Sequence, residues 1–121
     1  MKKVLIAEDS PAMRSLLIST IEALEGYEIV EAANGFEALR LLPRENVDLV
    51  ITDINMPDIN GLELIRYIRN NYNYESIPLF VISTESSEKN LAKGLSLGAN
   101  EYLVKPFDPL RLQELLKQYL G

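Results

Sequence analysis

A sequence of 121 residues with 47% hydrophobic and 25% charged residues has the size and composition of one globular domain, which excludes a disordered or membrane-embedded chain. Cysteine and histidine are both absent, which excludes disulfides, thiolate or imidazole metal sites, and catalysis by either side chain. A net charge of −6 repels the phosphate backbone, so nucleic acid is not expected as a direct partner.

The first residues, Met1-Lys2-Lys3, begin like a signal peptide but do not continue as one. The apolar run over residues 4–7 is stopped by Glu8 and Asp9, short of the roughly 7–15 apolar residues that a signal peptide needs. No other apolar run approaches the roughly 18 residues of a membrane span. We therefore expect a cytoplasmic protein without a membrane partner.

Five segments have the patterns of β-strands. Four are short, continuous apolar runs, which predict strands covered on both faces. A fifth segment, residues 28–32, alternates in polarity and predicts a strand nearer the edge of the sheet. The four continuous runs are residues 4–7, 49–52, 79–82 and 102–104.

Helical periodicity or helix boundary signals mark the segments between and after these strands. Asp9 or Ser10 can cap the first helix and Pro11 suits its first turn. The second follows Asn34-Gly35 and is expected to stop at Pro43, because proline cannot continue a helix. The predicted helices are residues 11–24, 36–42, 62–70, 88–97 and 110–120.

This regular alternation predicts an α/β fold: a doubly wound, five-stranded parallel sheet with helices on both faces. Five such units most often adopt the flavodoxin-like strand order 2-1-3-4-5. No linker, repeat or boundary divides residues 1–121, so one domain is expected. The residues after Lys105 suffice for one helix and its preceding turn, and no separate output domain is expected.

Carboxylates follow the two strands that should lie at the centre of this sheet. Glu8 and Asp9 follow the first strand and Asp53 follows the third. Ligands of doubly wound sheets bind at the carboxyl ends of such strands, so the three acids should converge. Asp9 alone would be assigned as a helix cap and Asp53 alone as a turn cap. Together they predict a site for a hard cation with oxygen ligands, and Mg²⁺ suits it best.

A hydroxyl and an ammonium group reach the same edge of the sheet. Ser83 ends the fourth predicted strand and Lys105 follows the fifth. Alone, Ser83 would be a satisfied hydroxyl and Lys105 a surface charge. Beside three acids they indicate a phosphoryl site, where Asp53 is the nucleophile and Lys105 neutralises phosphoryl oxygens.

Several motifs occur in order along nearly the whole chain: Val-Leu-Ile-Ala-Glu8-Asp9-Ser10, Ile51-Thr52-Asp53-Ile54-Asn55-Met56-Pro57, Asn60-Gly61, Ile82-Ser83-Thr84 and Val104-Lys105-Pro106-Phe107. Together they resemble the receiver domains of two-component response regulators, above all the free-standing, CheY-like receivers. The resemblance implies a signalling phosphoprotein rather than an enzyme, with chemotaxis as its expected pathway and a monomer as its expected state.

The resemblance also implies roles for single residues. Asp53 would accept a phosphoryl group from a histidine kinase or a histidine phosphotransfer protein. Mg²⁺ would be bound by Glu8, Asp9, Asp53 and the backbone carbonyl of Asn55. Ser83 and Lys105 would engage the phosphoryl group.

Signal output is expected at a second place. Tyr102 matches the position at which the family carries an aromatic switch residue. From the sequence alone, Tyr102 is explained equally well as an aromatic side chain that packs against the sheet. A downstream protein would bind the face formed by the fourth helix, fifth strand and fifth helix. The Lys105-Pro106 peptide bond would be cis.

Two departures and four alternatives accompany this interpretation. Glu8 stands where aspartate is commoner, and Thr84 replaces a smaller residue beside the site, which leaves the phosphate lifetime open. A phosphorelay intermediate, a pseudo-receiver that acts without phosphorylation, and a receiver cut from a larger regulator stay open. A haloacid-dehalogenase-like phosphatase is disfavoured because its second acid would stand where this chain has Asn55.

Overall fold

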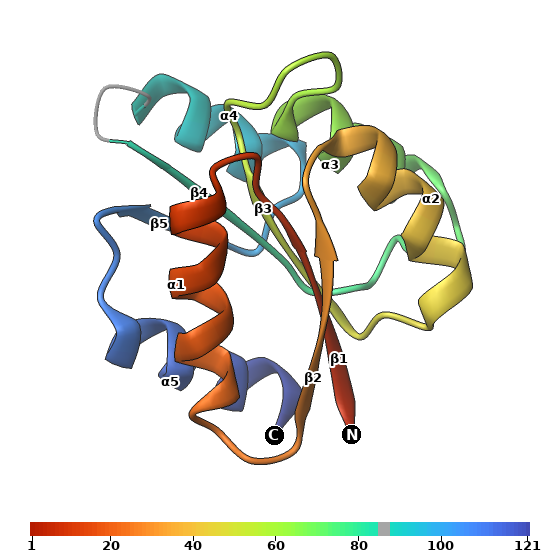
Figure 1. Cartoon of the computed structure of the whole chain (residues 1–121). Helices are drawn as coiled ribbons and strands as arrows, with labels where there is room; N and C mark the ends of the chain where they lie inside the picture. Colours follow the sequence, from red (N-terminus) through yellow and green to blue (C-terminus); the bar gives the residue numbers. More distant parts are fainter. Residues whose placement is uncertain (85–87) are drawn as a thin grey trace.

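The computed structural model describes residues 1–84 and 88–121, in which strands and helices alternate along the chain (Figure 1). The strands are β1 (Lys2–Ala7), β2 (Tyr27–Ala32), β3 (Leu49–Asp53), β4 (Leu79–Thr84) and β5 (Glu101–Lys105). The helices are α1 (Pro11–Glu22), α2 (Gly35–Glu45), α3 (Gly61–Asn70), α4 (Glu88–Leu97) and α5 (Pro109–Leu120).

The strands form one parallel sheet in the order β2-β1-β3-β4-β5, which confirms the predicted fold and strand order. The helices α1 and α5 cover one face, and α2, α3 and α4 cover the other (Figure 1). Strand β1 therefore lies beside β3, with Ala7 paired to Thr52. The segments that follow β1 and β3 begin side by side at the carboxyl edge of the sheet.

Alternate residues of the central strands supply the two halves of the core. In β1, Val4 and Ile6 pack toward α1 and α5, whereas Leu5 and Ala7 pack toward α2, α3 and α4. All four side chains are essentially inaccessible to solvent. Burial on both faces fixes the strand register, because a slip of one residue would exchange the two faces.

Four of the helices begin at this carboxyl edge or beside it, and each has a polar N-cap residue. Ser10 caps α1 by accepting a hydrogen bond from the Met13 N–H, which settles the choice between Asp9 and Ser10. Asn60 forms a reciprocal capping box with Glu63 at the start of α3. Asn34 and Asp108 cap α2 and α5.

Two predictions about local structure are wrong. Helix α2 does not stop at Pro43 but continues to Glu45 and ends at Asn46, which has φ of 52°. Pro43 removes one donor in the last turn, where Leu42 is fully buried, and packing of that turn outweighs the missing hydrogen bond. Strand β5 is not covered on both faces, because it lies at the sheet edge and Tyr102 is 49% exposed.

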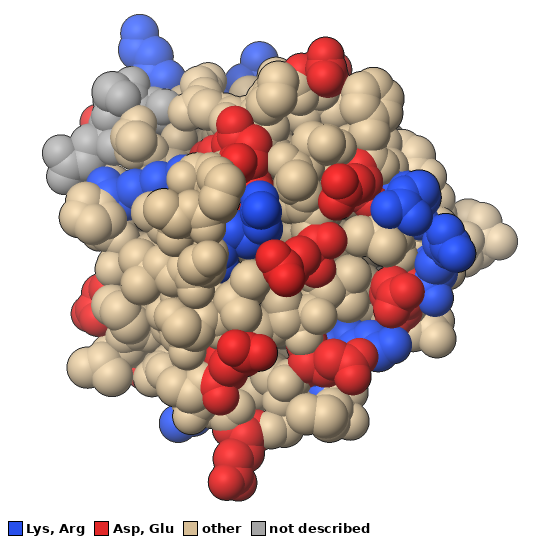
Figure 2. Space-filling model, viewed as in Figure 1, with Lys and Arg blue, Asp and Glu red and all other residues tan. Residues whose placement is uncertain are grey.

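Among residues 1–84 and 88–121, no helix combines the length and apolarity needed to cross a membrane. Figure 2 shows the face formed by α1, β2 and α2, where acidic side chains alternate with fewer basic ones. The ion pairs of α1, β1, β2 and α2 include Lys3 with Glu28 and with Glu45, and Arg14 with Glu31. The negative net charge of the chain is thus partly balanced locally on this face.

Candidate functional site

The structure brings the predicted acids together at the carboxyl edge of the sheet. Glu8 and Asp9 follow the last residue of β1, and Asp53 is the last residue of β3. Each offers a carboxylate oxygen, and these oxygens lie within 4.8 Å of one another. The convergence expected from strand order is therefore present.

Lys105 lies against two of these acids. Its Nζ atom is 3.2 Å from Glu8 Oε2 and 3.4 Å from Asp53 Oδ2. Glu8 is fully buried and Asp53 is 3% exposed, whereas Asp9 is exposed. One ammonium thus faces two buried carboxylates, so the cluster keeps excess negative charge.

Two buried carboxylate oxygens have no hydrogen-bond partner among the described residues, Glu8 Oε2 and Asp53 Oδ1. Glu8 Oε2 is close to Lys105 but lacks hydrogen-bond geometry, while Glu8 Oε1 accepts hydrogen bonds from the Ser10 N–H (3.1 Å) and from Lys105 (3.5 Å). Buried polar atoms are normally paired, because an unpaired one loses its hydration. Two such oxygens in one cluster of acids indicate that the site is shaped for a further cation or donor.

Burial raises the pKa of the Asp53 carboxyl above its ordinary value, although the ammonium of Lys105 opposes the rise. The pKa of Glu8 is also raised, first by burial and then by the charge of Asp53. Without a metal, the folded protein therefore holds these protons more tightly than a free carboxyl does. The donor set contains only oxygen and suits a hard cation such as Mg²⁺.

Ser83 lies on the same edge, within β4, and its side chain is fully buried. Its hydroxyl accepts a hydrogen bond from the side-chain amide of Asn55 at 3.2 Å. Asn55 itself is exposed in the loop that follows Asp53. The family resemblance assigns a role only to the backbone carbonyl of Asn55, and the side-chain contact with Ser83 is an additional finding of the structure.

Two further residues near the site were missed by the motif reasoning. Arg14 donates a hydrogen bond from Nη1 to the backbone carbonyl of Glu8 at 2.7 Å. Gly61 packs so closely that a Cβ atom there would lie 2.3 Å from the carbonyl oxygen of Asp53. The Asn60-Gly61 pair is one of the motifs shared with the family, but the close approach of Gly61 to Asp53 depends on the fold.

The expected cis peptide bond between Lys105 and Pro106 is present. Tyr102 lies on β5 and borders a groove against α4. Thr84, the last residue of β4, is exposed beside the site. Phosphorylation of a receiver is expected to move the segment after β4, and residues 85–87 of that segment lie outside the described residues.

Comparisons with known proteins agree with this fold and show the family of the chain. The family model for the response regulator receiver domain matches residues 4–117. The chain belongs to this family, whose members are generally signalling proteins rather than catalysts.

Chemotaxis proteins are among the relatives that this chain resembles. The chain is 40% identical to a chemotaxis protein CheY homolog from Campylobacter jejuni over 98% of this chain and 92% of that protein. It is 37% identical to the chemotaxis protein CheY1 of Helicobacter pylori over 98% and 97% of the two chains.

Solved structures of receiver proteins share the fold of this chain. The chemotaxis response regulator CheY4 of Vibrio cholerae has a TM-score of 0.88 and 36% identity, and the match covers 99% of both chains. The receiver domain of a sensor histidine kinase from Pseudomonas aeruginosa has a TM-score of 0.89 and 28% identity, and covers 99% and 98% of the two chains. That structure is described with a magnesium ion coordinated in its active-site cleft.

Proposed function

We propose that this protein is a phosphoacceptor response regulator in which Asp53 takes a phosphoryl group in a Mg²⁺-dependent reaction. The observation that carries the proposal is the buried Asp53 Oδ1, which has no hydrogen-bond partner among the described residues and belongs to a carboxylate held by Lys105. An oxygen with free lone pairs beside a fixed cation can act as a nucleophile toward phosphorus.

The donor would be a phosphohistidine of a histidine kinase or of a histidine phosphotransfer protein. A carboxylate oxygen of Asp53 forms the new P–O bond while the P–N bond to the imidazole breaks. The electron pair of the broken bond stays on the imidazole nitrogen, which takes up a proton. Lys105 stays close enough to Asp53 to offset charge on the phosphoryl oxygens.

Glu8, Asp9, Asp53 and the Asn55 backbone carbonyl would hold the Mg²⁺ ion. The cation would neutralise charge on both the carboxylates and the phosphoryl group. The proximity of the three carboxylates supports this assignment. The unpaired Glu8 Oε2 supports it as well, because a metal or a metal-bound water would supply its missing partner.

Intact-mass measurement after incubation with a small phosphodonor tests this function. Wild-type protein with Mg²⁺ should gain one phosphoryl group, and chelation of Mg²⁺ should suppress the gain. The matched control is Asp53→Asn, which keeps the shape of the side chain and should gain none. A wild-type protein that gains no phosphoryl group would be a pseudo-receiver, and the proposal would be wrong.

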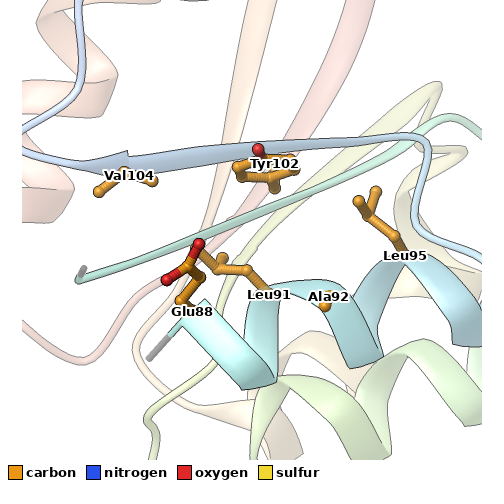
Figure 3. Close-up of a pocket in the computed structure, with 6 residues that line it drawn as sticks. All are labelled: Glu88, Leu91, Ala92, Leu95, Tyr102 and Val104. Atoms are coloured by element: carbon orange, nitrogen blue, oxygen red, sulfur yellow. The ribbon is translucent and has the colours of Figure 1, made fainter. Parts of the chain in front are cut away.

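Output would occur at the face formed by α4, β5 and α5. A groove opens there between α4 and β5, and Figure 3 shows its side chains facing each other from the two elements. Leu95 and Tyr102 are 37% and 49% exposed, so apolar surface is available to a downstream protein. The lining residues are Glu88, Leu91, Ala92, Leu95, Tyr102 and Val104.

Phosphorylation would be communicated to this groove through Ser83 and Tyr102. The Ser83 hydroxyl would turn from the Asn55 amide toward the phosphoryl oxygens, and the segment after β4 would move with it. Tyr102 would then fill the space that opens. A shift in the ratio of active to inactive conformation from 1:99 to 99:1 needs about 5.5 kcal/mol of differential interaction. One charge-assisted hydrogen bond supplies roughly 1.5–3 kcal/mol. Lys105 must therefore contribute, or the switch is partial.

The variant Ser83→Ala tests this switch. It should still accept phosphate on Asp53, because the nucleophile and the acids are unchanged. It should bind a phosphorylation-dependent partner more weakly than the phosphorylated wild type does. Equal partner affinity in the two phosphorylated proteins would contradict the mechanism.

Chemotaxis is the pathway that we propose, with the kinase as donor and a downstream protein as target. The relatives from Campylobacter jejuni and Helicobacter pylori support this choice, since both are named as chemotaxis proteins and are of nearly the same length. Swimming behaviour of a deletion strain tests it: complementation by the wild type and not by Asp53→Asn is expected.

A further inference from the structure

Arg14, in the first turn of α1, bridges two separate segments of the chain, the loop that follows β1 and the edge strand β2. Its Nη1 donates a hydrogen bond to the Glu8 carbonyl at 2.7 Å, and its Nε donates to the Glu31 carboxylate at 3.2 Å. The Arg14 side chain is 19% exposed, whereas that of Glu31 is 56% exposed. The guanidinium thus ties the loop after β1 to the edge strand β2.

The backbone of Glu8 is held on both sides as a result. Its N–H donates a hydrogen bond to the Ala32 carbonyl at 3.1 Å, and its carbonyl accepts from Arg14. The Glu8 carbonyl and the Asp9 N–H belong to one planar peptide unit. The orientation of this peptide sets the position of the Asp9 Cα, from which the exposed Asp9 side chain extends.

We propose that Arg14 is a positioning residue that holds Glu8 and Asp9 in the arrangement that binds Mg²⁺, with Glu31 anchoring its guanidinium. This inference rests on the proposed function, because the Mg²⁺ site is part of it. Carboxylates within 4.8 Å of one another repel, so an unanchored loop would move Asp9 away from Glu8 and Asp53. Two hydrogen bonds from one rigid, planar group oppose that movement.

Electrostatics and positioning predict opposite results when Arg14 is removed. Arg14 is a cation near a cation site, so its charge alone weakens Mg²⁺ binding, and Arg14→Met would then bind Mg²⁺ more tightly. If Arg14 positions the acids, Arg14→Met binds Mg²⁺ more weakly although a repulsive charge has gone. The sign of the change therefore separates the two roles.

The test is a Mg²⁺ titration followed by the NMR amide signals of Asp9 and Asp53, with no phosphodonor present. Arg14→Met should raise the Kd about 10-fold, the usual effect of losing a residue that orients metal ligands. Arg14→Lys keeps the charge but lacks the fork that reaches both acceptors, so its Kd should rise as well.

Lys3→Met is the matched control. Lys3 lies on β1, at the opposite end of that strand from Glu8, and its Nζ pairs with Glu28 and Glu45 at 3.6 and 3.8 Å. This variant removes the same charge without touching the site, and its Kd should equal that of the wild type. An unchanged or lower Kd in Arg14→Met would overturn the proposal.

Amide hydrogen exchange in metal-free protein gives a second readout that does not depend on Mg²⁺. Faster exchange at Asp9 and Ser10 in Arg14→Met, with unchanged exchange in β3, would support the positioning role. Equal exchange at Asp9 and Ser10 in the two proteins would contradict it. Failure of the wild type to bind Mg²⁺ would instead refute the proposed metal site, and the exchange result would still decide whether Arg14 orders the loop.

Discussion

Replacement of Lys105 by methionine should destabilise the metal-free protein strongly at neutral pH. Lys105 is 16% exposed and is the ion-pair partner of two buried carboxylates, at 3.2 Å from Glu8 and 3.4 Å from Asp53. Removing one partner of a buried pair costs about 3–5 kcal/mol, because a buried charge loses its compensation. We therefore expect Lys105→Met to lose about 3–5 kcal/mol of unfolding free energy at pH 7.5.

The loss of unfolding free energy in Lys105→Met should become smaller as the pH falls. The folded-state pKa values of Glu8 and Asp53 are already raised, and removal of Lys105 raises them further. Carboxyls with raised folded-state pKa values bind protons more tightly in the folded state, so stability falls as pH rises from the unfolded pKa through the folded one. Below about pH 4 both states are protonated and the loss should vanish.

Urea unfolding followed by circular dichroism measures the unfolding free energy of the wild type and of Lys105→Met at pH 7.5, pH 5 and pH 4. The control is Lys93→Met, since Lys93 is an exposed lysine on α4 and its removal should change stability little. A loss below about 1 kcal/mol at pH 7.5, the size expected of an exposed ion pair, would refute the reasoning. So would a loss of equal size at every pH.

Further predictions concern Gly61 and Asp53. Gly61→Ala places a Cβ atom 2.3 Å from the Asp53 carbonyl oxygen, so the backbone must shift. Urea unfolding should show a loss of about 1–3 kcal/mol of unfolding free energy, and phosphorylation of Asp53 should slow. Gly94→Ala, whose Cβ would meet its neighbours at 3.5 Å, should be stable, and equal behaviour of the two variants would contradict the prediction. Asp53→Asn should raise the urea midpoint of metal-free protein at pH 7.5, because burial raises the pKa of Asp53 and disfavours its charge. Mg²⁺ should then stabilise the wild type more than Asp53→Asn, and equal stabilisation would be evidence against the metal site.

The order of strands and the edge where the site lies could be predicted from the sequence. Continuous apolar runs such as residues 49–52 mark strands buried on both faces, and parallel strands place the residues after them at one edge. The convergence of Glu8, Asp9 and Asp53 follows from that topology. Burial of β5 was overestimated, because an apolar run does not distinguish a central strand from an edge strand covered by part of a helix.

The end of α2 and the contacts of Arg14 and Gly61 could not be predicted in the same way. The end of α2 depends on how well Leu42 packs after Pro43, which is a tertiary effect that outweighs local propensity. The contact of Arg14 with the Glu8 carbonyl depends on the side-chain rotamer and on the loop path, and no spacing in the sequence encodes either. Gly61 is needed because the start of α3 lies close to the end of β3, and this proximity appears only in the folded chain.

The central claim is that Asp53 alone carries the phosphoryl group. The most direct measurement is reduction of the phosphorylated protein with borohydride, which converts an aspartyl phosphate to homoserine, followed by tandem mass spectrometry of its peptides. We predict homoserine at residue 53, only after incubation with phosphodonor and Mg²⁺. No reduction product is expected at Glu8 or Asp9, whether 5-hydroxynorvaline or homoserine, because both are assigned as metal ligands and not as the nucleophile. Conversion at any other aspartate, or none at residue 53 in protein that has gained a phosphoryl group, would contradict the claim.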